Sequence, residues 1–298
     1  MLAISCVHRR CGGTVLLNLG NGGCHKLPPQ WDWAQMSVSR RHNVAVSGSG
    51  AKTMLLAHGY GCDQTMWRFV APAFATDYKT VLIDLAGSGN SDLSEYDHEK
   101  YATLHGHAAD ILEICDELAL TDVVFVGHSV SAMIGVLAAN RAPGRFSNLV
   151  MIGPSPYYIN DGDYIGGFTR QDIDGLLELL EANYFGWTSK FAPVIMGVPG
   201  RPELAEELAN SFCRTDPEIA QHFGRVTFLS DHRVDVKKVA TPSLILQCSN
   251  DLIAPIPVGE WLHRSIPRSS LVIMQATGHC PHLSAPEETI AAILDYLK

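Results

Sequence analysis

The segment that most restricts the fold of this chain is a strand-like run that leads directly into a serine and then into a helix. Residues 123–127 are apolar and mostly β-branched, Ser129 follows after one histidine, and residues 131–142 have a helical pattern. A serine on such a turn is held above the carboxyl end of a sheet, at the positive end of the following helix. The segment therefore predicts a sheet whose strands are followed by helices.

The rest of the chain repeats this alternation of strands and helices. Apolar runs of strand length lie at residues 53–57, 80–85, 123–127, 148–152, 243–247 and 270–274. Residues 37–46 are predicted to form an additional first strand. Helical patterns such as residues 101–118 lie between strands, and residues 285–297 form a last helix. Strands separated by helices predict an α/β fold, with a mostly parallel sheet and helices on both faces.

One long interval departs from this alternation. Between residues 152 and 242 there is no strand pattern, and the helical patterns cover residues 170–183, 202–213 and 217–228. Pro202 and Pro217 begin two of them, as expected for a residue that the first turn of a helix tolerates. We predict a helical cap at residues 157–237, inserted into a core made of residues 36–156 and 238–298.

The first 35 residues differ in character from the rest. They contain no acidic residue before Asp32 and show no long apolar periodicity. Arg9 and Arg10 are followed by Cys-Gly-Gly, where a secretory signal would need a continuous apolar stretch. We predict that residues 1–35 are a disordered extension and that the folded protein begins near Met36.

The composition argues against several classes of protein. The chain has 31 acidic and 22 basic residues and a formal net charge of -9, so its field repels nucleic acid and anionic lipid. Its apolar runs are too short to cross a membrane. Its eight cysteines show no CxxC pair, and its 13 histidines show no pair with ligand spacing on one helix face. These features predict a cytoplasmic protein with reduced thiols, without a metal or a cofactor.

Two further strands end at residues that can activate the serine. A serine hydroxyl is a weak nucleophile that needs a histidine as base and an acid to orient that histidine. The run at residues 243–247 leads to Asp251, and the run at residues 270–274 leads to a Gly-His loop with His279. The order serine, acid, histidine is that of α/β hydrolases. Because parallel strands end at the same edge of a sheet, we predict a triad of Ser129, Asp251 and His279.

Neighbouring residues fit these roles less well. The G-x-S-x-G pattern has glycine at its last position, where this chain has Ser131, so the motif is incomplete as a bare string. Asp84 is interpreted as the anchor of a turn rather than as the acid. His282 is expected to pack beneath its loop, and His128 cannot readily reach the oxygen of the adjacent serine.

A glycine-rich turn supplies the remaining chemistry of acyl transfer. The strand at residues 53–57 runs into His58-Gly-Tyr-Gly. Acyl transfer needs N–H donors for the oxyanion that develops on the substrate. We expect the main-chain N–H groups of Tyr60 and Val130 in this role, one on the turn and one directly after the nucleophile.

Taken together, these motifs resemble those of one family of small α/β-hydrolases over nearly the whole chain from Met36. That family includes the bacterial stress regulator RsbQ and the plant strigolactone and karrikin receptors. The segments that carry the resemblance are His58-Gly-Tyr-Gly-Cys-Asp-Gln, Asp84-Leu-Ala-Gly-Ser-Gly-Asn-Ser-Asp, Gly127-His-Ser-Val-Ser-Ala-Met-Ile-Gly, Gly166-Gly-Phe and Gly278-His-Cys-Pro-His. The elbow of the plant receptors also ends in serine, which accounts for Ser131.

The resemblance also implies an architecture and a pocket. It implies a core sheet of about eight strands, a four-helix cap and an apolar cavity that ends at Ser129. The pocket residues that it implies are Tyr60, His128, Tyr158, Phe168, Trp187 and Phe191. Each of these aromatic side chains could instead belong to the core of the cap.

Two functions fit this pattern. The first is an RsbQ-like serine hydrolase that acts on a small hydrophobic ester or a butenolide-like lactone. The second is a signalling receptor or regulator with slow hydrolysis, which recruits a protein partner near the cap; in the bacterial branch the resemblance implies a stress-response phosphatase. Both functions need an intact triad. Dehalogenases and epoxide hydrolases carry an acid at the elbow, so Ser129 argues against them, while a haloperoxidase-like side reaction stays open.

Overall fold

The computed structural model describes residues 16–18, 24–26 and 37–298, and the chain divides into two compact units, Met1–Met36 and Ser37–Lys298. In the first unit, strand β1 (Leu16–Asn18) pairs with β2 (Cys24–Lys26) in antiparallel orientation. The predicted disorder of residues 1–35 otherwise falls on residues outside the described ones. The second unit contains all the residues discussed below.

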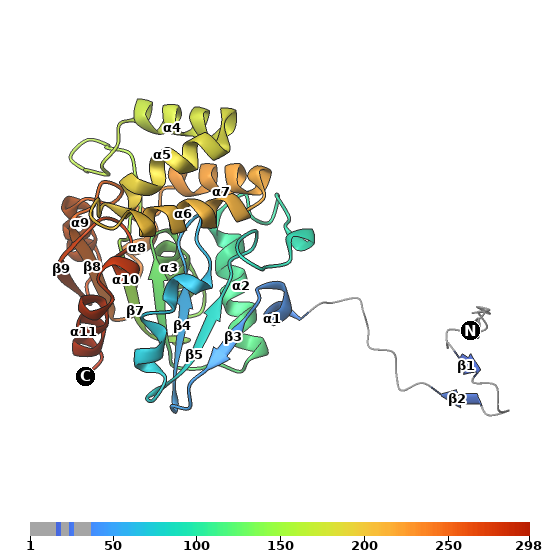
Figure 1. Ribbon diagram of the computed structural model, residues 1–298. Helices are drawn as coiled ribbons and strands as arrows, with labels where there is room; N and C mark the ends of the chain where they lie inside the picture. Colours follow the sequence, from blue (N-terminus) through green and yellow to red (C-terminus); the bar gives the residue numbers. More distant parts are fainter. Residues whose placement is uncertain (1–15, 19–23, 27–36) are drawn as a thin grey trace. The chain divides into compact units, whose positions relative to one another are not determined.

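The second unit is built on a seven-stranded sheet with the order β3-β5-β4-β6-β7-β8-β9 (Figure 1). Strand β3 is antiparallel to β5, and the other neighbours are parallel, which confirms the predicted sheet type. The order reverses around β4, which lies between β5 and β6, and ligands bind at such a switch point. The strands are β3 (Ala45–Ser47), β4 (Lys52–Ala57), β5 (Tyr78–Ile83), β6 (Val123–His128), β7 (Phe146–Ile152), β8 (Ser243–Asn250) and β9 (Ser269–Thr277).

The predicted first strand at residues 37–46 is confirmed only at its end. These residues begin with the short helix α1 (Val38–Arg41), and strand β3 covers only the end of the segment. The side chain of Ser37 accepts a hydrogen bond from the main-chain N–H of Arg40, and the carboxylate of Glu117 accepts one from the N–H of Val38. These acceptors satisfy the first N–H groups of a helical turn. The sheet has seven strands in the described residues, β3 among them, instead of the eight or so that the resemblance implied.

Helices cover both faces of the sheet, and two cores result. Because successive side chains of a strand point to opposite faces, Leu55 belongs to a core that includes residues of α2, α3 and α9. Met54 belongs to a second core, which includes residues of η1, η2 and α11. The elements outside the sheet and the cap are η1 (Gln64–Trp67), η2 (Ala71–Phe74), η3 (Leu93–Glu95), α2 (Leu104–Glu117), α3 (Val130–Arg141), α8 (Arg233–Val236), α9 (Ile256–Ser265), α10 (Pro281–Ser284) and α11 (Pro286–Tyr296).

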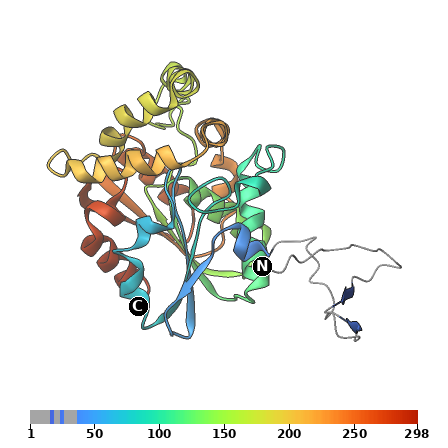
Figure 2. The ribbon, with the colours of Figure 1, turned by 45° about the vertical axis from the view of Figure 1, so that its right-hand side comes forward.

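Four helices between β7 and β8 lie together over one end of the sheet (Figures 1 and 2). They are α4 (Arg170–Ala182), α5 (Tyr184–Met196), α6 (Pro202–Arg214) and α7 (Pro217–Leu229). The four-helix cap implied by the resemblance is confirmed. Helix α5 has no counterpart among the helical patterns, because it contains Pro193 and an irregular run of aromatic residues. The proposed boundaries of the cap, 157–237, stay a prediction.

Candidate active site

Ser129 lies on the tight turn between β6 and α3. Its φ and ψ angles are 56° and -121°, a backbone conformation that residues other than glycine rarely adopt. Its main-chain N–H donates to the oxygen of Ile152 at 2.8 Å, which fixes the turn to β7. The serine therefore sits at the carboxyl edge of the sheet and at the N-terminus of α3, as the sequence predicts.

Gly127 and Ser131, the two small residues on either side of Ser129, are needed for different structural reasons. A Cβ on Gly127 would lie 2.6 Å from the main-chain oxygen of Ser131, so only glycine fits there. The Ser131 side chain is fully buried, and its hydroxyl donates to the main-chain oxygen of His58. The serine in place of the usual glycine thus joins the Ser129 turn to the end of β4.

Three side chains from three strand ends form one hydrogen-bonded chain. Nε2 of His279 lies 2.7 Å from the Ser129 hydroxyl oxygen, and Nδ1 lies 2.7 Å from Oδ2 of Asp251. The second carboxylate oxygen of Asp251 accepts from the N–H groups of Ile253 and Ala254 at 2.8 and 3.1 Å. A carboxylate only accepts, so Nδ1 of His279 carries a proton and Nε2 is the acceptor for the serine hydroxyl. The structure brings together all three residues of the predicted triad.

Asp84, the other acid considered for this role, serves as a turn anchor. One of its carboxylate oxygens accepts from the main-chain N–H of Gln64 at 2.8 Å. The other accepts from the Asn43 side chain at 2.7 Å and from the Asn90 N–H at 2.9 Å. Because both oxygens are engaged in this turn, Asp84 holds the loop after β5.

The loop that carries His279 is attached to the cap. The N–H of His279 donates to the oxygen of Ile195 near the end of α5 at 2.8 Å. The hydroxyl of Thr277 donates to the oxygen of Gly197 at 3.1 Å. Gly278 has a φ of 77°, and a Cβ there would lie 1.8 Å from the oxygen of Met196. The backbone of the loop and the end of α5 therefore fit closely together.

The glycine-rich turn after β4 lies directly beside Ser129. A Cβ on Gly59 would lie 3.2 Å from the Cβ of Ser129. Within residues 37–298, no acceptor is found for the main-chain N–H of Tyr60 or Val130. The phenolic hydroxyl of Tyr60 donates to the oxygen of Ala220 at 2.7 Å and attaches the turn to α7. Two N–H groups at this turn and at the start of α3 are thus available to an oxyanion.

A mostly apolar cavity ends at Ser129. Four of the residues that the resemblance implies line it, namely Tyr60, His128, Tyr158 and Trp187. Phe191 stacks on Trp187 at 5.0 Å without lining the cavity, and Phe168 packs in the cap core. The other lining residues are Cys62, Ile195, Leu208, Phe212, Thr227, Phe228, Ile253, His279 and Cys280. Most of these lie on cap helices, where sequence does not distinguish cavity-facing from core-facing side chains.

Burial favours the neutral forms of four ionisable groups that line the cavity. Burial raises the pKa of Tyr158 to about 12 and raises the pKa of the Cys62 and Cys280 thiols above the usual range. Burial also lowers the pKa of His128 well below its usual value. Among the described lining residues there is no Asp, Glu, Lys or Arg. The cavity therefore suits an uncharged ligand, because a buried charge would lack a partner.

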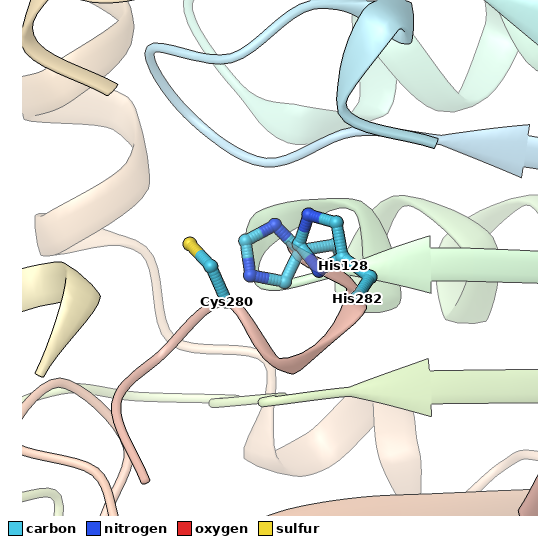
Figure 3. A group of neighbouring side chains, drawn as sticks. All are labelled: His128, Cys280 and His282. Atoms are coloured by element: carbon cyan, nitrogen blue, oxygen red, sulfur yellow. The ribbon is translucent and has the colours of Figure 1, made fainter. Parts of the chain in front are cut away.

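Behind the triad, three buried side chains that could ligate a metal lie close together. One ligand atom each of His128, Cys280 and His282 lies within 4.8 Å of the others. Figure 3 shows the two imidazoles against each other, with the Cys280 sulfur pointing away from them. Nε2 of His128 lies 2.8 Å from the His279 oxygen, and a Cβ on Gly59 would lie 2.5 Å from its Nδ1. Both nitrogens of His128 thus face protein atoms, and we interpret the cluster as packing around the His279 backbone.

The chain is similar to known proteins over most of its length. It matches the model of the alpha/beta hydrolase family over residues 54–292. It is 39% identical to Karrikin insensitive 2 receptor CA of Petunia hybrida, over 87% of this chain and 97% of that protein. It is 36% identical to a strigolactone esterase of Arabidopsis thaliana, over 86% of this chain and 96% of that protein.

A solved structure gives the same result. The chain superposes on a hydrolase from Oleispira antarctica with a TM-score of 0.85 and 41% identity, over 87% of this chain and 96% of that one. The resemblance to the plant receptors that the motifs indicate is confirmed. In the described part of the chain, no helix is long and apolar enough to cross a membrane.

Proposed function

Because the chain belongs to the alpha/beta hydrolase family, we propose that it is a serine hydrolase that cleaves small, uncharged esters or butenolide-like lactones. The observation that carries the proposal is the hydrogen-bonded series Ser129–His279–Asp251, with 2.7 Å at each step. The relatives named as strigolactone esterase and karrikin receptor support a small-molecule ligand. The neutral lining of the cavity supports an uncharged one.

The proposed reaction proceeds by acyl transfer. Nε2 of His279 takes the proton of Ser129 as its oxygen attacks the substrate carbonyl, and Asp251 stabilises the imidazolium that forms. The N–H groups of Tyr60 and Val130 stabilise the oxyanion, for which loss of one donor typically costs about 3 kcal/mol. His279 then gives the proton to the leaving oxygen, and a water molecule releases the acyl group by the same steps in reverse.

A second candidate function is that of a signalling receptor with slow turnover. The receptor named among the relatives favours it, as does the hydrogen bond from the His279 N–H to Ile195, which links the proposed base to the cap. In this proposal, a ligand bound at Ser129 changes the conformation of the cap. The changed cap then binds a protein partner, such as a signalling phosphatase. The five cysteines of residues 37–298 are unpaired, which supports a reducing compartment such as the cytoplasm.

The proposals are tested with p-nitrophenyl esters and a butenolide, by rate and by intact mass. Ser129→Ala and Asp251→Asn are expected to lower kcat by about a thousandfold or more, because each removes part of one catalytic unit. Ser147→Ala is the matched control, since its hydroxyl is exposed and donates only to the Asp122 oxygen. Turnover or acylation that persists in Ser129→Ala would contradict the hydrolase. Ligand-dependent partner binding that persists in Ser129→Ala, without turnover, would favour the receptor.

A further inference from the structure

Two cap side chains bring hydrogen-bond donors without acceptors to the wall of the cavity. Thr227 of α7 and Trp187 of α5 both line it, and they are only 2% and 1% exposed. Within residues 37–298, neither the Thr227 hydroxyl nor the Trp187 indole nitrogen has a hydrogen-bond partner. Buried polar groups nearly always have a hydrogen-bond partner. Two donors without a partner at the wall of a ligand cavity therefore indicate that the ligand carries an acceptor.

Several other polar groups of the cavity already have partners. The Tyr158 hydroxyl interacts with the Ser129 side chain, at the site of the proposed attack. The Tyr60 hydroxyl donates to the Ala220 oxygen, and Nε2 of His128 lies at 2.8 Å from the His279 oxygen. The thiols of Cys62 and Cys280 are weak donors whose raised pKa keeps them protonated. The Thr227 hydroxyl and the Trp187 indole N–H are therefore donors of the cavity wall that lack a partner and lie outside the proposed acyl-transfer machinery.

A neighbouring threonine shows how a buried threonine hydroxyl of the cap can be satisfied by its own helix. Thr188 lies beside Trp187 on α5 and is fully buried, but its hydroxyl donates to the oxygen of Phe185 at 2.9 Å. Helical threonines commonly bond to their own helix in this way. Thr227 makes no such bond on α7, so its hydroxyl stays available to a ligand.

We propose that Thr227, together with the Trp187 indole N–H, forms a polar subsite that donates hydrogen bonds to one oxygen of the substrate, remote from the bond that is cleaved. The ligand class is an uncharged ester or lactone with an additional ether or carbonyl oxygen. This inference rests on the proposed hydrolase function, because it assigns the substrate class of the same cavity. A site that hydrogen-bonds a ligand oxygen discriminates against the analogue with a methylene group in its place.

The test compares substrates that differ only by an oxygen in place of a methylene group. The acyl pair is p-nitrophenyl methoxyacetate and p-nitrophenyl butanoate, and the alcohol pair is methoxyethyl acetate and butyl acetate. The inherent reactivity of each ester is the same for every variant, so it cancels when ratios of kcat/KM are compared. In Thr227→Val the ratio of ether to alkyl ester is expected to fall about fivefold in at least one pair, since one neutral hydrogen bond is lost.

Thermal unfolding supplies a readout that separates ligand binding from packing. Thr227→Val is expected to keep or raise Tm, because it removes an unpaired buried hydroxyl. Thr188→Val is the matched control, and it is expected to lower Tm and leave both substrate ratios unchanged. Unchanged ratios in both pairs for Thr227→Val, or a fall in Tm as large as that of the control, would overturn the subsite.

Failure of the proposed function gives a different result. If the wild-type protein cleaves none of the four esters, hydrolysis of this substrate class is contradicted while the subsite is still tested by binding. The probes are the matched nitrobenzyl ketones, in which a methylene group replaces the ester oxygen. Their affinities are measured by ligand-induced shifts in Tm. A preference for the ether ketone that is lost in Thr227→Val supports the subsite, and equal affinities in the wild-type protein overturn it.

Discussion

Nε2 of His128 lies 2.8 Å from the main-chain oxygen of His279, so the residue before the proposed nucleophile holds the backbone of the proposed base. A carbonyl oxygen only accepts, and Nε2 of His128 is therefore the protonated nitrogen. On its other side, the His279 N–H donates to the oxygen of Ile195 in the cap. The position of His279 thus depends both on the Ser129 turn and on α5.

Replacing His128 tests this first attachment. His128→Leu is expected to lower kcat about tenfold to a hundredfold with little change in KM, because a small displacement of His279 impairs proton transfer more than ligand binding. His128→Gln is expected to recover part of the loss, since its side-chain amide can donate to the same carbonyl. The measurements are steady-state kinetics and the rate at which a fluorophosphonate labels Ser129.

A structural role alone would give another pattern. If His128 only filled space, the leucine and glutamine variants would have labelling rates that follow their loss of stability. Equal kcat in wild-type protein and His128→Leu, at temperatures where both are folded, would contradict the positioning role.

Ser131→Ala tests the link between the elbow and the turn after β4. The hydroxyl of Ser131 is fully buried and donates to the main-chain oxygen of His58. In the alanine variant this buried oxygen loses its hydrogen-bond donor. We expect the free energy of unfolding to fall by about 2 kcal/mol, as measured by urea denaturation. Ser147→Ala should change it by less than about 0.5 kcal/mol, because the hydroxyl of Ser147 is exposed. Similar losses in both variants would contradict a specific role for the Ser131 hydroxyl.

The sheet and the triad could be predicted from the sequence because their signals are local. Strands β6 and β8 are buried on both faces and therefore appear as continuous apolar runs, and each ends at a residue with distinct chemistry, Ser129 or Asp251. The start of the first strand was mispredicted because the capping bonds of Ser37 and Glu117 compete with strand pairing, and Glu117 lies far along the chain. Capping by a distant side chain leaves no pattern in the segment itself.

The cavity could not be predicted to the same extent. Phe191 and Trp187 lie one helical turn apart on α5, yet only Trp187 lines the cavity, because Phe191 stacks behind it. Thr227 carries no signal of its function in the sequence, since a threonine on an amphipathic helix is ordinary. The packing of the four cap helices against each other decides which side chains face the ligand.

Gly278→Ala tests the fit between the His279 loop and the cap. The new Cβ would lie 1.8 Å from the oxygen of Met196, at a φ of 77°. We expect a loss of more than about 2 kcal/mol in unfolding free energy and a large fall in kcat, because the loop and α5 must separate. Gly144→Ala is the matched control, with a φ of 86° and no atom within 4 Å of the new Cβ. It isolates backbone strain and should leave kcat unchanged; equal effects of both variants would contradict the fit.

The buried ring of His282 makes the fold sensitive to acid. Burial lowers the pKa of His282 to about 3 from 6.5, and its ring stacks between His128 and Trp67 at 4.4 and 4.8 Å. As pH falls below 6.5, the unfolded chain binds a proton here that the folded protein does not bind until about pH 3. The contribution of this ring to stability is therefore complete above the unfolded pKa and is lost progressively as the pH falls through this window.

His282→Phe keeps an aromatic ring at this position and removes the titrating group. From pH 7 to pH 5 the variant should therefore lose about 2 kcal/mol less unfolding free energy than the wild-type protein. Urea denaturation at the two pH values measures this difference. The buried His107, whose pKa burial also lowers to about 3, should respond alike when replaced by phenylalanine. Parallel losses in wild-type protein and His282→Phe would mean that the ring is protonated in the folded protein as readily as in the unfolded chain.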